Sequence, residues 1–367
     1  MTELAGIIRD EINLQGVVSF ARFMELALYH PRLGYYEQEQ GRVGRAGDFY
    51  TSVSTGPLFG ELLAFQFGEW LESLPAGTGP LCLVEAGAHD ARLAADLLPA
   101  LQRQRPKLFA RIQYVILEPS AERRAWQADR LKTFADRVRW ADSPRTLHSA
   151  PIHGVIFSNE LLDAFPVRRH GWDAAGKAWF EWGVGWQAGQ FVWAKIPNSA
   201  PPNRRPELEA VLPDGYVIEH SPAAAAWWRD AADALHSGRL LAIDYGFTTE
   251  EQWSPARPHG TLRAYARHQV SDHLLANPGE QDLTAHVNFS AIQAVGESAG
   301  LNSEAFTTQP RFLTQILART QTAPAFGDWN AARTRQFQTL THPEHLGRAF
   351  RVLIQQRPPG RGASGKA

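Results

Sequence analysis

Four acidic residues in this chain of 367 residues each follow a short apolar segment. They are Glu85 in LVEAG, Glu118 in VILEPS, Glu160 in IFSNE and Asp244 in AIDYG. The apolar segments show little alternation of apolar and polar residues, which is typical of strands covered on both faces of a parallel sheet. Because ligands of open α/β sheets bind at the carboxyl ends of the strands, we expect these acids to line the rim of an active site.

Glu118 has the clearest chemistry of the four. A carboxylate that ends the second strand can accept hydrogen bonds from both hydroxyls of an adenosine ribose. The alternative is local, because Glu118 precedes a helical segment and its negative charge favours the positive end of the helix dipole. The loop after the preceding strand, PLCLVEAG, favours the ribose role over the local one.

That loop lies in the stretch VEAGAHDARLAADLL (84–98), where an apolar run leads through a turn into an amphipathic helix. A dinucleotide site needs three glycines at this point, for the turn, for close approach to the pyrophosphate and for helix packing. Only Gly87 fits, so we expect neither NAD nor FAD. S-adenosylmethionine has no pyrophosphate, and a class I methyltransferase requires fewer glycines in this loop.

Strand and helix patterns alternate from residue 80 to about 165, which is the βαβαβ order of a doubly wound α/β domain. Residues 172–196 then alternate large apolar and polar residues around two turns, as in an antiparallel hairpin. The α/β order resumes with a helix that has Ser221 as its expected N-cap and Gly238 near its C-terminus. Five segments are therefore expected: an N-terminal helical region with a glycine-containing loop (1–75), the first part of the α/β domain (76–165), an inserted β-hairpin lobe (166–220), the remainder of the α/β domain (221–356) and a disordered tail (357–367).

The overall composition excludes several classes of function. The chain has 37 Lys and Arg residues against 38 Asp and Glu residues, so no global field favours nucleic acid or an anionic membrane. No window approaches the roughly eighteen continuous apolar residues of a membrane span. The single cysteine, Cys82, excludes an internal disulfide and a cysteine-rich metal site, and no metal is expected. The first residues contain acids and lack the patterns of signal and transit peptides, so a cytoplasmic location is expected.

Several motifs along the chain resemble one known family. They occur here in the order typical of the MidA-type family: GRAGDFYTSVSTGPLFGELLA, LVEAG, SNELLDAFPVR, VIEHSP, LLAIDYG, GTLRAY, DLTAHVNFSAI and LTHPEHLGRAFRVL. That family comprises S-adenosylmethionine-dependent methyltransferases, including the mitochondrial arginine methyltransferase that assists assembly of respiratory complex I. The resemblance extends from about residue 5 to 355 and implies a class I methyltransferase-like fold.

The resemblance also implies a cofactor, a partner and a set of site residues. The cofactor is S-adenosylmethionine, and the partner is a protein substrate or an assembly partner, with the oligomeric state left open. The residues that it assigns to cofactor binding are Gly47, Glu85, Gly87 and Glu118. Those that it assigns to methyl transfer are Asp48, Asn159, Glu160 and Asp163. The roles of Asp244, Asp282 and His286 stay open.

Physical chemistry adds a reason to pair two of these residues. A guanidinium is planar, always cationic and best held by carboxylates. Glu160 and Asp163 are three positions apart in NELLDAF, so a helical turn would put both on one face. They could then orient a nitrogen lone pair toward the methyl carbon, the enzyme supplying proximity. The alternative is that Asp163 caps a turn before Pro166.

The loop after the first strand departs from the family. Members usually carry a run like E-L-G-P-G-x-G-x-L, whereas here His89 and Ala91 replace two glycines. Side chains at these positions could intrude on the methionine end of the cofactor, and Asp90 adds a negative charge where the cofactor's carboxylate would dock. Two outcomes are open: a working methyltransferase, or a non-catalytic binding or assembly factor that has lost its cofactor.

Overall fold

The computed structural model describes residues 2–38, 51–75, 79–148, 151–266, 269–344, 346–347 and 349–358. Gly47 and Asp48 and the tail from residue 359 onward lie outside these residues. The chain divides into two compact units, each built from three segments. The lobe unit comprises Met1–Asp48, Leu162–Ala226 and Gly246–Ala291, and the sheet unit comprises Phe49–Leu161, Trp227–Tyr245 and Ile292–Ala367.

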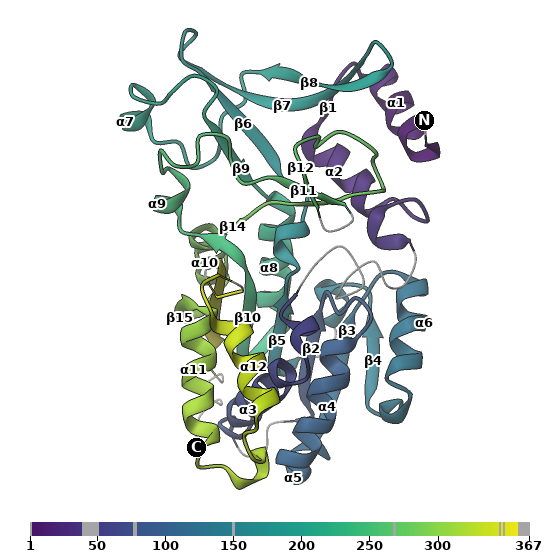
Figure 1. Cartoon of the computed structure of the whole chain (residues 1–367), viewed down its shortest axis with the longest axis vertical. Helices are drawn as coiled ribbons and strands as arrows, with labels where there is room; N and C mark the ends of the chain where they lie inside the picture. The colour runs from purple at the N-terminus through teal and green to yellow at the C-terminus, as the bar shows by residue number, and fades with distance from the viewer. Residues whose placement is uncertain are drawn as a thin grey trace, which may run out of the picture. The chain divides into compact units, whose positions relative to one another are not determined.

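The sheet unit is built on a mostly parallel sheet with the strand order β15-β16-β10-β5-β2-β3-β4 (Figure 1). The strands from β10 to β4 are parallel, and β16 is antiparallel to both of its neighbours. The bounds are β2 (Leu81–Ala86), β3 (Ile112–Leu117), β4 (Val138–Ala141), β5 (Ile152–Asn159), β10 (Leu235–Phe247), β15 (Asn302–Thr308) and β16 (Phe350–Arg357). This order confirms the predicted α/β fold of the class I methyltransferase type.

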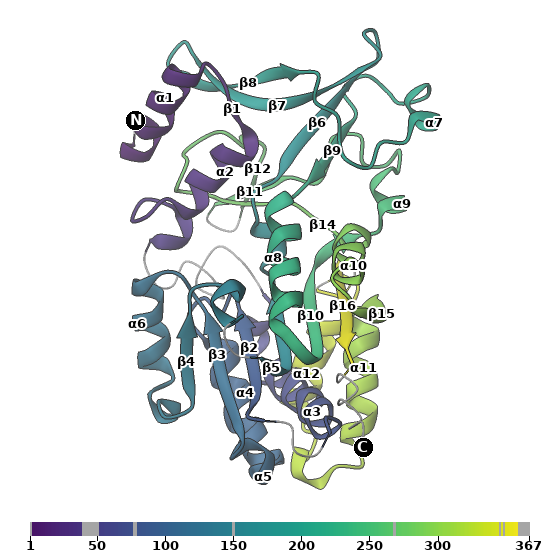
Figure 2. The same ribbon diagram turned by 180° about the vertical axis from the view of Figure 1, so that it is seen from behind.

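Helices of the sheet unit bury one face of this sheet. The bounds are α3 (Leu58–Glu72), α4 (Arg92–Gln104), α5 (Pro106–Phe109), α6 (Ala121–Arg130), α11 (Gln309–Thr320) and α12 (Ala331–Thr341), with α8 (Pro222–Ala234) and α10 (Phe289–Ser298) divided between the units. α3 is apolar around most of its circumference, and it packs with α4 and α11 onto Leu83, Tyr114 and Phe157. α6 follows β3 and lies beside β4 at the edge of the sheet in both views (Figures 1 and 2).

The lobe unit contains the expected antiparallel strands. β7 (Ala178–Gln187) pairs with β1 (Val18–Ser19), β6 (Arg168–Asp173) and β8 (Gln190–Pro197), and β6 pairs in turn with β9 (Val217–His220). α1 (Glu3–Gln15) and α2 (Phe20–Tyr29) bury their apolar faces with residues of this sheet (Figure 2). The remaining bounds are α7 (Pro206–Glu209), α9 (Thr249–Gln252), β11 (Arg263–Ala266), β12 (Gln269–Ser271), β13 (Asp282–Thr284) and β14 (Val287–Asn288).

Two helix N-caps were predictable, and one helix end was not. The side chains of Ser19 and Ser221 accept hydrogen bonds from the N–H groups of Arg22 and Ala224 at the starts of α2 and α8. Gly238 was expected near the C-terminus of this helix, but α8 ends at Ala234 and Gly238 lies within β10, which begins at once. Gly238 lies opposite Gly154 of β5, where a Cβ would come within 1.9 Å of the Gly154 carbonyl oxygen. This glycine permits close approach of two strands.

The observed units divide the chain differently from the expected segments. The predicted helical region 1–75 is split, since α1 and α2 belong to the lobe unit and α3 to the sheet unit. The last strand, β16, also runs through Arg357, where the tail was expected to begin. Sequence periodicity locates helices, but which core each helix joins depends on residues far away in the chain. No helix among the described residues is long and apolar enough to cross a membrane.

Candidate active site

The carboxyl ends of four neighbouring strands bring the predicted acids of the sheet unit together. In the strand ladders Ala86 of β2 lies opposite both Leu117 of β3 and Ser158 of β5. Asn159 of β5 lies opposite Ile243 of β10. Because each acid lies within one residue of these positions, all four end at the same edge of the sheet, where α/β folds bind their ligands.

The loop between β2 and α4 has the backbone conformation that glycine favours. Gly87 has a φ of 76°, and the two residues that replace family glycines also have positive φ, 46° for His89 and 59° for Ala91. An L-residue in this region costs roughly 1–2 kcal/mol relative to the right-handed region. The methyl group of Ala91 is fully buried among the apolar residues of the core. The loop therefore retains its shape without the glycines, at a cost in free energy.

The charge that Asp90 adds to this loop is matched by arginines. Its carboxylate accepts a 2.8 Å hydrogen bond from Arg130 and a 3.2 Å bond from the N–H of Arg92, whose guanidinium lies 3.9 Å away. Burial acts to raise the pKa of Asp90, but the His89 side chain and the nearby arginine charges prevail and lower it. The negative charge expected to repel the cofactor's carboxylate is thus offset within the loop.

Glu118 is buried and already has several partners. Its Oε1 accepts a 2.9 Å bond from the N–H of Ser120, and the Nε atom of Arg123 lies 2.9 Å from the same oxygen. Its Oε2 accepts a 3.2 Å bond from Gln127. Since a carboxylate offers about four lone-pair positions, acceptor capacity remains on Oε2. The bond from Ser120, the N-cap of α6, also supports the local role at the helix start.

Glu85 is more enclosed than a residue of an open rim. Its side chain accepts a 2.5 Å hydrogen bond from the hydroxyl of Tyr114, and only 3% of the residue is exposed. Burial raises the pKa of Glu85 to about 7, with the Tyr114 hydrogen bond opposing the shift and the charge of Asp90 adding to it. This carboxyl group braces β2 against β3 beneath the loop.

Asn159 and Glu160 form the turn at the end of β5. Glu160 has a φ of 53°, and its N–H donates to the carbonyl of Ile243 at 2.9 Å. Its carboxylate accepts bonds from the Asn159 amide at 3.0 Å and from the N–H of Ser52 at 3.2 Å. Burial raises the pKa of Glu160 to about 8 against these two hydrogen bonds, and the negative charge of Asp244 raises it further. The side-chain oxygen of Asn159 is buried and has no partner among the described residues.

Asp244, whose role the sequence left open, holds this turn. It is fully buried and accepts hydrogen bonds from the N–H of Leu161 at 3.1 Å and from its neighbour Tyr245 at 2.8 Å. Leu161 also packs against Gly87, where a Cβ would come within 3.1 Å of its Cδ1 atom. Asp244 thus links the ends of β10 and β5 through backbone N–H groups.

The predicted pairing of Glu160 with Asp163 on one helical face is wrong. Glu160 adopts the left-handed conformation, and the 3-10 turn that contains Asp163 begins only at Leu162. The two residues also fall in different units, with Asp163 in the lobe unit. A helical face requires consecutive right-handed residues, and Glu160 interrupts them.

Within the lobe unit Asp163 and Asp282 lie near tyrosines. The carbonyl of Asp163 accepts a 2.9 Å bond from the N–H of Ala285, and the Tyr36 hydroxyl donates to Asp282 at 2.9 Å. Burial raises the pKa of Tyr36 well above its usual value, and the charges of Asp282 and Asp163 add to the effect. His286 packs its ring near Phe247, with the centroids 6.0 Å apart.

Sequence analysis did not name three residues that shape this rim. Tyr114 had a signal, because a phenol in an otherwise aliphatic buried strand needs a hydrogen-bond partner. Ser52 had a weaker one, since it lies within a family motif. Gln127 had none, because a glutamine among the charged residues of an amphipathic helix is expected to face water.

Comparison with known proteins shows the family to which the whole chain is similar. A family model for S-adenosyl-L-methionine-dependent methyltransferases matches residues 62–307. A protein from Burkholderia thailandensis, solved with bound S-adenosyl-homocysteine, is 35% identical with a TM-score of 0.80, covering 96% of this chain and 92% of its own. The chain belongs to this methyltransferase family. Human mitochondrial protein arginine methyltransferase NDUFAF7 is 26% identical over 98% of this chain and 85% of its own length. The Drosophila melanogaster homologue is 26% identical over 95% and 84%.

Membership settles the cofactor of this methyltransferase as S-adenosylmethionine. It also corrects one expectation. The cytoplasmic location is contradicted, because the curated relatives from human, Drosophila melanogaster and Danio rerio are mitochondrial proteins by name. Acidic residues near the start of a chain describe its surface, and they do not decide the compartment in which the folded protein works.

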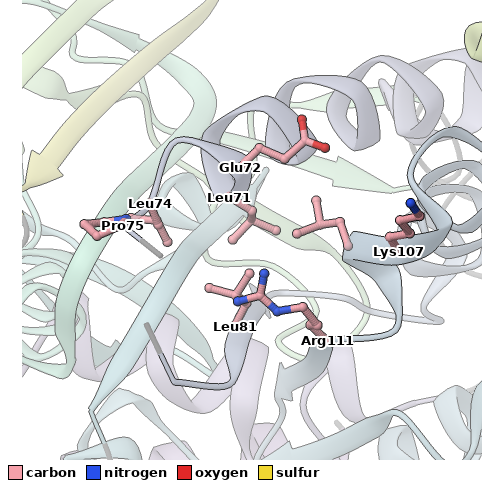
Figure 3. A pocket seen from close by; sticks show the side chains of 8 residues that line it. Leu71, Glu72, Leu74, Pro75, Leu81, Lys107 and Arg111 are labelled. Carbon is pink, nitrogen blue, oxygen red and sulfur yellow. The ribbon is translucent and has the colours of Figure 1, made fainter. Parts of the chain in front are cut away.

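A surface pocket of about 460 Å³ lies elsewhere in the sheet unit of the methyltransferase (Figure 3). Its lining residues are Leu71, Glu72, Leu74, Pro75, Leu81, Lys107, Leu108 and Arg111. Leu81 begins β2, whereas Glu85 lies near the opposite end of the same strand. The pocket is therefore at the amino ends of the strands, away from the four acids at their carboxyl ends. No group of three His, Cys, Asp or Glu side chains within the described ranges could hold a metal ion.

Proposed function

We propose that this methyltransferase transfers a methyl group from S-adenosylmethionine to an arginine side chain of a partner protein. The observation that carries the proposal is the turn at the end of β5, where the half-buried carboxyl group of Glu160 has a raised pKa. It accepts a hydrogen bond from Asn159, whose amide oxygen has no partner among the described residues. Relatives across nearly the whole chain are named protein arginine methyltransferases.

The residues of the rim fit the cofactor. The remaining acceptor capacity of Glu118 suits a ribose hydroxyl, and the buried oxygen of Asn159 can accept a hydrogen bond from an ammonium group. Gly87 supplies the turn, and the loop charge of Asp90 is offset by Arg130. These groups lie at the edge of the sheet where class I folds bind ligands.

Glu160 has the chemistry that arginine methylation needs from the protein. S-adenosylmethionine supplies an electrophilic methyl group on a sulfonium. A guanidinium beside Glu160 favours the ionised carboxylate, which accepts hydrogen bonds from its N–H groups and orients it. The methylated nitrogen must then lose a proton, and the ionised carboxylate of Glu160 beside it is the acceptor.

Calorimetric titration with S-adenosylmethionine and S-adenosylhomocysteine tests the cofactor part of the proposal. We expect micromolar binding, and at least tenfold weaker binding for Glu118→Ala. The matched control is Glu122→Ala, an exposed acid in α6, the helix that follows Glu118. No binding by the folded, unaltered chain contradicts the proposal and supports a non-catalytic assembly factor.

A second experiment tests the acceptor. The purified chain is incubated with a protein extract and isotopically labelled S-adenosylmethionine, and modified residues are mapped by mass spectrometry. We expect label on arginine nitrogen. Label confined to lysine, to carboxyl groups or to small molecules contradicts the arginine assignment while leaving methyl transfer intact.

A further inference from the structure

One face of α6 contacts both of the elements assigned to the cofactor. Arg123, Gln127 and Arg130 follow one another at intervals of four and three positions, so they lie on the same side of the helix. Arg123 pairs with Glu118, Arg130 pairs with Asp90 in the loop, and Gln127 contacts both regions. Gln127 is fully buried, at the centre of this face.

The hydrogen bonds of Gln127 fix the orientation of its amide. Its Oε1 accepts a 2.8 Å bond from the indole N–H of Trp140. Because an indole nitrogen can only donate, the amide oxygen must face Trp140 and the NH₂ group must face the other way. The NH₂ donates to the carbonyl of His89 at 2.9 Å and to Oε2 of Glu118 at 3.2 Å. Both donors and the acceptor are thus in use.

These contacts explain how the loop keeps its conformation without glycines. His89 and Ala91 each hold a left-handed conformation that costs roughly 1–2 kcal/mol. A different φ at His89 would turn its carbonyl away from Gln127 and leave a buried N–H without a partner. An unsatisfied buried polar group costs about 1–3 kcal/mol, which is enough to hold one such residue in place.

We infer that Gln127 is a positioning residue for the cofactor of this methyltransferase. It holds the glycine-poor loop in its left-handed shape and at the same time orients the carboxylate of Glu118. The inference rests on the proposed function, because it assumes that the cofactor binds at this rim. The competing view is that Gln127 only fills a polar gap between α6 and β4.

The test uses substitutions of Gln127 in the full chain. Gln127→Met keeps the length of the side chain and removes its hydrogen bonds, and Gln127→Glu places a second carboxyl group beside Glu118. The matched control is Asp129→Ala, which changes an exposed acid of the same helix and leaves the hydrogen bonds of Gln127 in place. Amide hydrogen exchange of residues 88–91 is measured without cofactor, and binding of S-adenosylhomocysteine is measured by calorimetry.

We expect exchange in the loop to rise at least tenfold and S-adenosylhomocysteine affinity to fall at least tenfold in both Gln127 variants. Asp129→Ala should change each quantity less than threefold. His89→Gly in the Gln127→Met background should restore part of the affinity, because glycine adopts positive φ without a clamp. A residue that only stabilises the fold predicts no such rescue.

The outcomes separate the two claims. Unchanged loop exchange and affinity in Gln127→Met overturn the inference even if the unaltered chain binds its cofactor well. An unaltered chain that binds no S-adenosylhomocysteine overturns the proposed function and the cofactor role of Gln127 with it. Exchange in the loop then decides by itself whether Gln127 holds the backbone.

Discussion

Two turns at neighbouring strand ends of the sheet unit both hold non-glycine residues at positive φ, and different contacts stabilise them. The β2–α4 loop places His89 and Ala91 at positive φ, and the turn after β5 does the same with Glu160. The loop is held by side chains of α6, through Gln127 and Arg130. The turn is held from the adjacent strand, since the carbonyl of Ile243 and the carboxylate of Asp244 accept its N–H groups.

The difference suits what each turn does in the proposed mechanism. A turn tied to a central strand by backbone bonds is rigid, which is required of a group that touches the reacting atoms. A loop tied by side chains can adjust as a ligand enters. Its positive φ angles cost free energy, and the loop would relax from them if α6 lost the side chains that hold it. The following predictions test this contrast.

The largest effect is expected at Glu160. Glu160→Gln keeps the hydrogen-bonding shape of the side chain and removes the carboxylate, so methyl transfer should fall at least 100-fold while S-adenosylhomocysteine binding changes less than threefold. Single-turnover rates and calorimetry measure the two quantities. Equal loss of both would mean that Glu160 serves cofactor binding, and full activity would remove it from the reaction.

The next effect is on stability, at the residue that holds the turn. Asp244→Ala leaves two buried N–H groups without an acceptor, so the free energy of unfolding should fall by about 3 kcal/mol. Denaturant titration measures it. Asp129→Ala, an exposed acid on α6, should change stability by less than about 0.5 kcal/mol. A loss at Asp244 no larger than this control would show that the turn does not depend on it.

Smaller effects of opposite sign are expected in the loop. Ala91→Gly should raise the free energy of unfolding by about 1 kcal/mol, because glycine adopts positive φ without the steric cost that alanine has there. His89→Gly should act in the same direction. Thermal melting of each variant is compared with Ala95→Gly inside α4, which should destabilise by about 1 kcal/mol. Destabilisation at both loop positions would mean that the loop is not left-handed.

The last prediction concerns the dependence of stability on pH. The pKa of Glu160 in the folded chain, about 8, lies above its ordinary value of 4.5, so the folded state binds more protons between these values. Stability should therefore fall as pH rises through this window, most steeply below the folded pKa. Urea titrations at several pH values from 5 to 8 should show a shallower decline for Glu160→Gln, and parallel curves would contradict the raised pKa.

Sequence reasoning succeeded where the signal is local. The caps Ser19 and Ser221 were found because an N-cap acts within three residues. The antiparallel strands of the lobe followed from alternation of apolar and polar residues, which has the period of a strand. The strand-end acids Glu85, Glu118 and Asp244 were located by position alone, since parallel strands present their carboxyl ends at one edge.

The prediction that Glu160 and Asp163 share a helical face was wrong because the backbone at Glu160 is set by a distant contact. Spacing of three residues predicts a shared face only if the backbone between them is helical. Here the bond from the Glu160 N–H to Ile243, more than eighty positions away in the chain, favours the left-handed turn instead. A local rule was overridden by a contact that no local window contains.

The sequence by itself determined the class of fold, the caps and the edge of the sheet at which the chemistry gathers, because hydrophobic period and strand order are properties of short segments. Only the tertiary structure decided that the β2–α4 loop adopts a left-handed conformation at His89 and Ala91, where the family has glycines. That outcome depends on Gln127, which is 38 positions from His89 and meets it only once α6 has packed beside β4. It likewise decided that Gly238 is a point of close strand approach and that Asp244 holds the turn of Glu160. Each of these outcomes depends on which groups become neighbours when the chain is folded, and spacing along the sequence does not give the distance between two groups in space.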